Sequence, residues 1–160
     1  MSIIYGRLFI ATIIALILTI LPLPDIFIGL RPPWVLMLIL YLQLFLPDYF
    51  KIYYLIILGL VLDVLLSTLL GQHVFALALV SWIASSKARR FRLFSIGQQM
   101  ALIGFFCLLY QLLIFMMDAS LGYSVRFAMA VGSAMISILL WPWLRLIADD
   151  TLLINKANRR

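Results

Sequence analysis

One acidic side chain lies inside a long apolar segment, and this combination limits the chain more than any other feature. Residues 52–71 read IYYLIILGLVLDVLLSTLLG, which is long enough to cross a bilayer, and Asp63 is the carboxylate within it. An ionised aspartate that faces lipid costs about 2.5–3.5 kcal/mol on insertion scales. We therefore expect Asp63 to point into a helix bundle or a wet cavity, or to stay protonated.

The spacing of small and polar residues favours the bundle. Gly59, Asp63 and Ser67 recur every four residues, which places them on one face of a helix. Such a stripe lets another backbone approach closely and offers hydrogen bonds, the interactions that pack helices in lipid. Asp63 is then either a packing residue, bonded to Gln43 or Gln111 of a neighbouring segment, or part of a pocket or partner contact. The sequence leaves both interpretations open.

Composition gives the class of protein. Of the 160 residues, 66% are hydrophobic and 11% are charged, which is too little polar surface for a soluble globule and indicates a polytopic membrane protein. The net charge of +6 does not indicate nucleic-acid binding, because the basic residues lie between apolar segments. The single cysteine, Cys107, excludes an internal disulfide.

The apolar segments predict an all-α fold with six transmembrane helices in residues 1–148, followed by a polar cytoplasmic tail, 149–160, with no core to join. The expected spans are residues 8–21, 34–46, 52–71, 74–86, 96–117 and 127–148. The second and fourth are short for a hydrocarbon core about 30 Å thick. In a five-span alternative the fourth segment enters the membrane without crossing it.

The distribution of Lys and Arg orients the chain, because cytoplasmic loops retain positive charge. With both termini in the cytoplasm, only Arg31 and Arg126 lie outside. The cytoplasmic set is Arg7, Lys51, Lys87, Arg89, Arg90, Arg92, Arg145, Lys156, Arg159 and Arg160. Trp141 and Trp143 are then expected at the inner interface, with Pro142 bending the last helix.

Two local clusters each allow two interpretations. Arg31-Pro32-Pro33-Trp34 reads as an interfacial anchor with a snorkelling arginine, or as a recognition surface for another chain. The basic connector, defined as Lys87, Arg89, Arg90 and Arg92, reads as a topogenic signal. It could instead attract anionic lipid, at about 1 kcal/mol per charge, or an acidic cytosolic partner.

Signals for catalysis are missing from the sequence. It contains one histidine and one cysteine, no metalloprotease or phosphate-loop motif, and no pair of carboxylates at helical spacing within a span. His73 is expected to be a loop histidine satisfied by backbone or water, and Asp63 alone makes no proton relay. The residues therefore predict no enzyme, no metal site and no cofactor.

Four motifs, taken in order, are similar to one family. They are Leu21-Pro22-Leu23-Pro24-Asp25, Arg31-Pro32-Pro33-Trp34, Gly59-Leu60-Val61-Leu62-Asp63 followed by Leu70-Gly71, and Leu140-Trp141-Pro142-Trp143-Leu144. Over nearly its whole length the chain resembles the rod shape-determining membrane proteins of the MreD family of proteobacteria. Pro33 departs from the family's Arg-Pro-polar-Trp pattern.

The resemblance implies a non-catalytic protein of the bacterial inner membrane that supports lateral peptidoglycan synthesis and rod cell shape. It implies as partners MreC, the filament protein MreB, and RodA with its class B penicillin-binding transpeptidase. It also implies a fold like the six-helix substrate-binding subunits of vitamin ECF transporters. Arg31, Trp34, Gly59, Asp63 and Gly71 hold the motif positions.

The resulting hypothesis is a membrane scaffold that docks the transmembrane helix of MreC at the small-residue stripe, with its basic inner face near the filament or anionic lipid. Arg31, Trp34, Gly59, Asp63, Ser67 and Gly71 are the candidates for partner or ligand binding. The alternative is a small-molecule or lipid binder or carrier with an intramembrane pocket at Asp63.

Overall fold

The computed structural model describes residues 2–21, 31–86, 88–91, 93–122 and 127–153. Within these ranges the chain is helical and contains no β-strand. The elements are α1 (Ser2–Ile20), α2 (Trp34–Phe45), α3 (Ile52–Leu65), α4 (Gln72–Ser85), α5 (Ala88–Phe91), α6 (Ile96–Ser120), α7 (Phe127–Ala148) and the π-helix η2 (Asp149–Leu153). Residues 22–30, which hold most of the first family motif, lie outside the described residues, as do Arg126 and the tail from residue 154.

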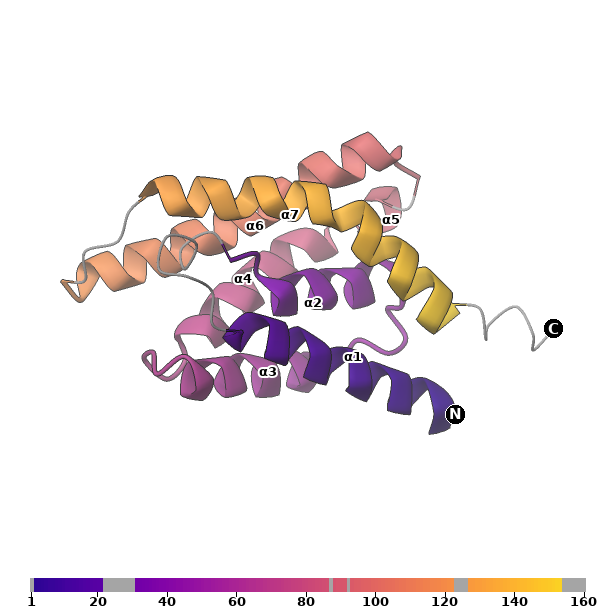
Figure 1. Cartoon of the computed structure of the whole chain (residues 1–160), viewed down its shortest axis with the longest axis horizontal. Coiled ribbons are helices and arrows are strands. Elements are labelled where there is room, and N and C mark those ends of the chain that lie inside the picture. The colour runs from indigo at the N-terminus through magenta and orange to yellow at the C-terminus, as the bar shows by residue number, and fades with distance from the viewer. Residues whose placement is uncertain (1, 22–30, 87, 92, 123–126, 154–160) are drawn as a thin grey trace.

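The six longer helices form three layers, which Figure 1 shows one above another. The outer layers are the pair α6 and α7 and the pair α1 and α3, and α2 and α4 lie between them. Contacts follow this order, because α1 packs on α2, α3 on α4, α2 on α4, and α4 on α6. Successive long helices run in opposite directions, so the start of α1 and the end of α7 lie at the same end of the molecule.

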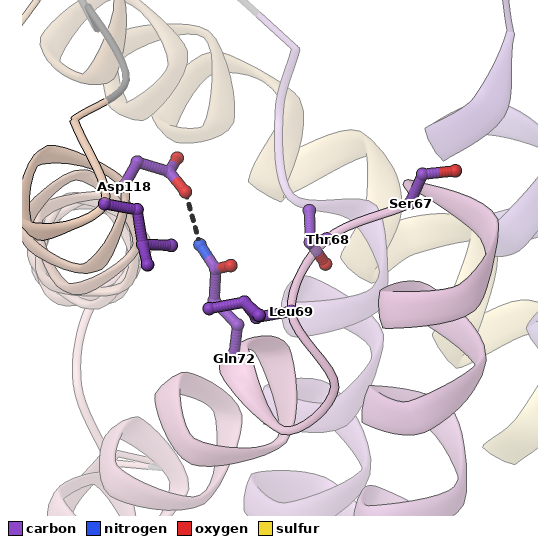
Figure 2. Close-up of a pocket in the computed structure, with 6 residues that line it drawn as sticks. Ser67, Thr68, Leu69, Gln72 and Asp118 are labelled. Carbon is purple, nitrogen blue, oxygen red and sulfur yellow. Dashed lines mark hydrogen bonds between the residues drawn. The ribbon is translucent and has the colours of Figure 1, made fainter.

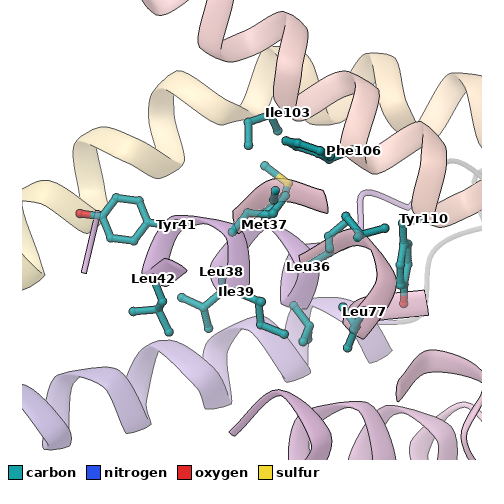
Figure 3. Close-up of a cluster of buried hydrophobic side chains, with 14 of the residues drawn as sticks. Leu36, Met37, Leu38, Ile39, Tyr41, Leu42, Leu77, Ile103, Phe106 and Tyr110 are labelled. Carbon is teal, nitrogen blue, oxygen red and sulfur yellow. The ribbon is translucent and has the colours of Figure 1, made fainter. Parts of the chain in front are cut away.

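Helix α2 is the centre of the core. Its sequence is apolar on every side, and a helix of that kind must be enclosed by other helices or by lipid. Protein encloses it here, because ten of its twelve residues are buried. Figure 3 shows its side chains meeting those of α4 and α6, among them Leu77, Ile103 and Phe106. Pro33 stands immediately before Trp34 at the helix start, as the sequence predicts.

Helix length separates the segments into two groups. Residues 96–120 and 128–151 form helices long and apolar enough to cross a membrane. Helices α2, α3 and α4 have only 12–14 residues, and twelve residues rise only about 18 Å. The helical fold is confirmed, whereas the number of spans stays a prediction. The third segment was predicted too long, because its helix ends at Leu65 and not at Gly71.

The last helix closes the end of the bundle where the chain begins and ends. Asp149 accepts a hydrogen bond of 2.6 Å from the Tyr41 hydroxyl of α2 and lies 3.5 Å from Arg145. The Arg7 guanidinium donates to the backbone oxygen of Thr151 at 2.6 Å. The prediction that residues from Asp149 onward join no core is therefore wrong for η2, because two other helices bind it.

The aromatic residues near the end of α7 divide between core and surface. Trp141 is fully buried and meets the ring of Phe91 edge to face, with the ring centroids 6.2 Å apart. Phe91 of α5 covers it, so the Trp141 ring packs inside the bundle instead of facing the headgroups, and its depth in the membrane stays a prediction. Trp143 is 68% exposed, as an interfacial residue requires. Pro142 lies inside α7, and the helix changes direction toward its end (Figure 1).

Two glycines mark close approaches between helices. A β-carbon at Gly59 would lie 2.7 Å from the Val74 Cα and 2.9 Å from its nitrogen, so α3 and α4 touch through their backbones. A β-carbon at Gly104 would lie 2.5 Å from Cδ1 of the Ile138 side chain and closer still to its Cγ1, and no backbone atom is among its nearest neighbours. A flexible side chain can move aside, whereas a backbone cannot do so without shifting its helix. Gly59 is therefore the less replaceable of the two.

We predict that Gly59→Ala lowers the free energy of unfolding by about 1–3 kcal/mol, the usual cost of forcing extra atoms into a packed core. Gly104→Ala should cost less, because it displaces a side chain, that of Ile138, and not a backbone. Gly6→Ala is the control, since nothing lies within 4 Å of its added carbon and alanine favours the helix. Thermal unfolding of the three variants in detergent checks the order. Equal midpoints for Gly59→Ala and Gly6→Ala would contradict the close approach.

Candidate functional site

The turn between α3 and α4 contains two residues in the left-handed region of backbone conformation. Gly71 has φ 98° and is the N-cap of α4, and Ser67 has φ 53°. Glycine adopts this conformation without cost, whereas serine does so rarely. Because Ser67 lies beyond the end of α3, it does not continue the helical face of Gly59 and Asp63. The predicted three-residue stripe is therefore wrong at its third member.

The Asp63 carboxylate sits at the centre of this turn. Oδ2 accepts a hydrogen bond from the Gly71 nitrogen at 2.7 Å, and Oδ1 accepts one from the His73 nitrogen at 2.8 Å. Oδ1 also lies 2.8 Å from His73 Nδ1 and 3.2 Å from the Thr68 hydroxyl. Within the described residues, both carboxylate oxygens are thus engaged by the chain's own donors.

These contacts make Asp63 a helix cap supplied by the preceding helix. The first backbone N–H groups of a helix have no partner within it, and they attract negative charge. Asp63 satisfies two of them at the start of α4 while remaining 1% exposed. A buried carboxylate is tolerated where donors and a basic group surround it. Asp63 therefore ties the end of α3 to the beginning of α4.

His73 is the nearest basic group to Asp63, and sequence reasoning misplaced it. It was expected in a loop, satisfied by backbone or water, but it lies in α4, is 5% exposed, and pairs with the carboxylate. The partners predicted for Asp63 are also wrong. Gln43 instead donates to the Ser81 backbone oxygen at 2.8 Å, and Gln111 donates to the Ser133 hydroxyl at 3.0 Å.

Gly59, the other stripe residue, lies one helical turn before Asp63 and is buried against α4. Its small size is used inside the protein, where it admits the backbone of Val74. Gly59 and Asp63 are thus on one face, as the spacing predicts, but that face packs on α4. It is not available for the helix of a partner.

A hollow of about 380 Å³ lies beside this turn, between α4 and the end of α6. Its lining residues are Ser67, Thr68, Leu69, Gln72, Asp118 and Leu121. Figure 2 shows the Gln72 amide pointing to Asp118, and their hydrogen bond measures 2.7 Å. Asp63 does not line the hollow and meets it only through Thr68. The hollow therefore does not open at Asp63, where a pocket was predicted, but beside residues of the adjacent turn.

Arg31 and Trp34 lie at the entry to α2 and connect three helices. The Arg31 backbone oxygen accepts a hydrogen bond of 2.5 Å from the Ser133 hydroxyl of α7, and its guanidinium lies 3.4 Å from the Thr19 oxygen of α1. Trp34 begins α2 and is half-buried against the core. Internal packing engages both residues, and neither lines the hollow.

The basic connector is only partly described. Lys87 and Arg92 lie outside the described residues, as does the side chain of Arg89. Arg90 is exposed on α5, at the end of the bundle opposite the hollow (Figure 1). The contacts of its described residues do not distinguish a topogenic signal from a binding surface.

Comparison with known proteins decides the family. A family model described as "rod shape-determining protein MreD" matches residues 2–149. The chain belongs to the MreD family. The rod shape-determining protein MreD of Haemophilus influenzae is 33% identical over 135 residues, covering 84% of this chain and 83% of the relative. MreD proteins are membrane proteins with a role in cell shape, and the apolar helices agree with that. No solved structure matches, so the likeness to ECF transporter subunits stays a prediction.

We predict that Asp63→Ala lowers the free energy of unfolding by about 2–4 kcal/mol, because it leaves buried backbone donors of Gly71 and His73 without an acceptor. Asp63→Asn should cost less, since one oxygen remains. Asp150→Asn, on an exposed residue of η2, is the matched control and should melt like the parent protein. Thermal unfolding in one detergent measures all three. An unchanged midpoint for Asp63→Ala would show that the cap contributes nothing.

Proposed function

We propose that this MreD protein is a non-catalytic, multi-pass scaffold of the inner membrane that maintains rod shape by holding other proteins of the wall-elongation machinery together. Family membership is the observation that carries the proposal. The described interior agrees with a scaffold, because α2 and its neighbours fill it with side chains. In this proposal the scaffold serves lateral peptidoglycan synthesis.

The proposed layout has six passes and both termini in the cytoplasm. Alternating helix directions and the hydrogen bond between Arg7 and Thr151 support an even number of passes, because they place both ends of the chain on one side. That end of the bundle also carries Lys51, Arg90 and Arg145, which favours the cytoplasm by the positive-inside rule. Short helices such as α2 are accommodated because protein encloses them.

We predict the orientation from two single-cysteine variants made after Cys107→Ser. Leu70→Cys, in the turn after α3, is 74% exposed, and Lys51→Cys is exposed at the opposite end of that helix. In intact spheroplasts a membrane-impermeant maleimide should label Leu70→Cys and leave Lys51→Cys unlabelled until the membrane is permeabilised. The opposite labelling would invert the layout, and labelling of both would show that α3 does not separate two compartments.

The partner proposed for direct contact in the bilayer is the transmembrane helix of MreC. The small-residue stripe is occupied by α4, so the dock must lie on an outer surface. Nearly half of the exposed large apolar side chains of the described residues lie on α1 and α3. These two helices form one outer layer of the bundle (Figure 1). We place the MreC helix on that layer, where association requires close packing in lipid.

The remaining partners are proposed at the ends of the bundle. The cytoplasmic end, with its basic residues, would lie near MreB filaments or anionic lipid. RodA and its class B penicillin-binding transpeptidase would associate within the membrane or through MreC. The alternative function, a binder or carrier with its pocket at Asp63, loses its site, because that carboxylate is buried and bonded on both oxygens.

Co-purification in mild detergent tests the dock. We predict that Ile14→Trp on α1, combined with Ile57→Trp on α3, lowers the recovery of MreC about tenfold, because a bulky ring costs a packed interface roughly 1–3 kcal/mol. Both positions are more than half exposed, at 51% and 56%, so the fold should tolerate the change. The control pair is Met135→Trp and Leu139→Trp on α7, at 63% and 67% exposure.

Recovery of MreC should stay at the parental level with the α7 pair. Equal recovery with both pairs would remove the proposed surface. A loss that occurs only with the α7 pair would move the dock to the opposite layer. Monodisperse elution of each variant shows that the bundle is intact.

A further inference from the structure

The hollow beside the α3–α4 turn has a lining that the scaffold function does not use. Its walls come from the turn, the start of α4 and the end of α6. Its volume of about 380 Å³ falls in the range of small-molecule sites. We propose that it binds a primary ammonium group, supplied by the ethanolamine headgroup of a membrane lipid. This inference is independent of the proposed docking of MreC.

The charge in the hollow comes from one carboxylate. Asp118 is the charged residue of the lining, and the described lining residues include no lysine or arginine. Gln72 is 1% exposed and fixes Asp118 by donating to Oδ1 at 2.7 Å. Oδ2 has no hydrogen-bond partner among the described residues, which leaves an oriented acceptor at the wall. Such a wall attracts a cation.

The hydrogen-bonding groups of the lining select among cations. A primary ammonium group has three N–H donors, and it needs acceptors within reach. Asp118 Oδ2 is such an acceptor, whereas the Ser67 hydroxyl lies on the opposite side of the lining and points away from Asp118 (Figure 2). The Thr68 hydroxyl is already held by Asp63 and His73. A quaternary ammonium carries the same charge but has no N–H donor, so it should bind less well.

The position of the hollow indicates a lipid as the source of the ammonium group. Asp118 lies in the last turn of α6, a helix of membrane-spanning length, so the hollow is at the depth of the headgroups. Two leucines of its lining are about half exposed, namely Leu69 at 53% and Leu121 at 45%. Phe75, at 53% exposure, lies one helical turn along α4 from the lining residue Gln72 and offers an apolar surface for an acyl chain.

Native mass spectrometry of the full chain in detergent tests the site, with dioleoylphosphatidylethanolamine, dioleoylphosphatidylcholine and dioleoylphosphatidylglycerol as probes. The wild-type protein should bind the ethanolamine lipid about tenfold more tightly than the other two, the usual value of a hydrogen bond to a charged group. Asp118→Asn should abolish this preference. Asp150→Asn, which neutralises an exposed aspartate at the far end of the bundle, should keep it.

A second variant tests the hollow without changing its charge. Leu121→Trp should fill it and reduce binding of the ethanolamine lipid severalfold, while Asp118 and Gln72 stay paired. Equal binding of the three lipids by the wild-type protein, or an undiminished preference in both Asp118→Asn and Leu121→Trp, would overturn the site. Free ethanolamine that binds as tightly as the lipid would support the ammonium site and assign it to a soluble amine.

Discussion

The buried contact between the Asp63 carboxylate and the first backbone N–H groups of α4 is the interaction on which the site depends. Without this contact, the N–H groups of Gly71 and His73 and the Asp63 carboxylate would be buried unpaired, and lipid cannot solvate them. With it, α3 can stop at Leu65 and α4 can begin at Gln72 while Gly59 lets their backbones touch. The same turn then fixes Thr68 and Gln72 beside Asp118.

A second constraint is that apolar sequence in this chain has two different surroundings. Helix α2 is apolar because other helices enclose it, whereas the exposed isoleucines of α1 and α3 face outward. In lipid both surroundings accept the same residues, so hydropathy does not distinguish the centre of the bundle from its rim. The distinction comes from contacts, with the short helices α2 and α4 inside and the two longest, α6 and α7, along one side.

Sequence reasoning predicted the helices well where a local signal existed. The prolines before Trp34 mark the start of α2, and Phe127 and Ala148 bound the last helix as predicted. An internal partner for Asp63 was one of two interpretations of the sequence, and the partners named for it, Gln43 and Gln111, were wrong. Because the segment from Leu65 to Gly71 is apolar, it reads as a continuing helix, and the break that brings His73 back to Asp63 is hidden. Gly71 was the local signal for this break. No local signal indicated that Asp118 pairs with Gln72, because the two residues are 46 positions apart in the sequence.

The hydrogen bond between Tyr41 of α2 and Asp149 of η2 can form only late in synthesis. The acceptor for the Tyr41 hydroxyl, Asp149, follows it by 108 residues, and at 5–20 residues per second a ribosome needs about 5–20 s to deliver it. During that interval the Tyr41 hydroxyl of α2 lacks its native acceptor. The contact between α2 and η2 therefore forms late, after all six longer helices have been synthesised.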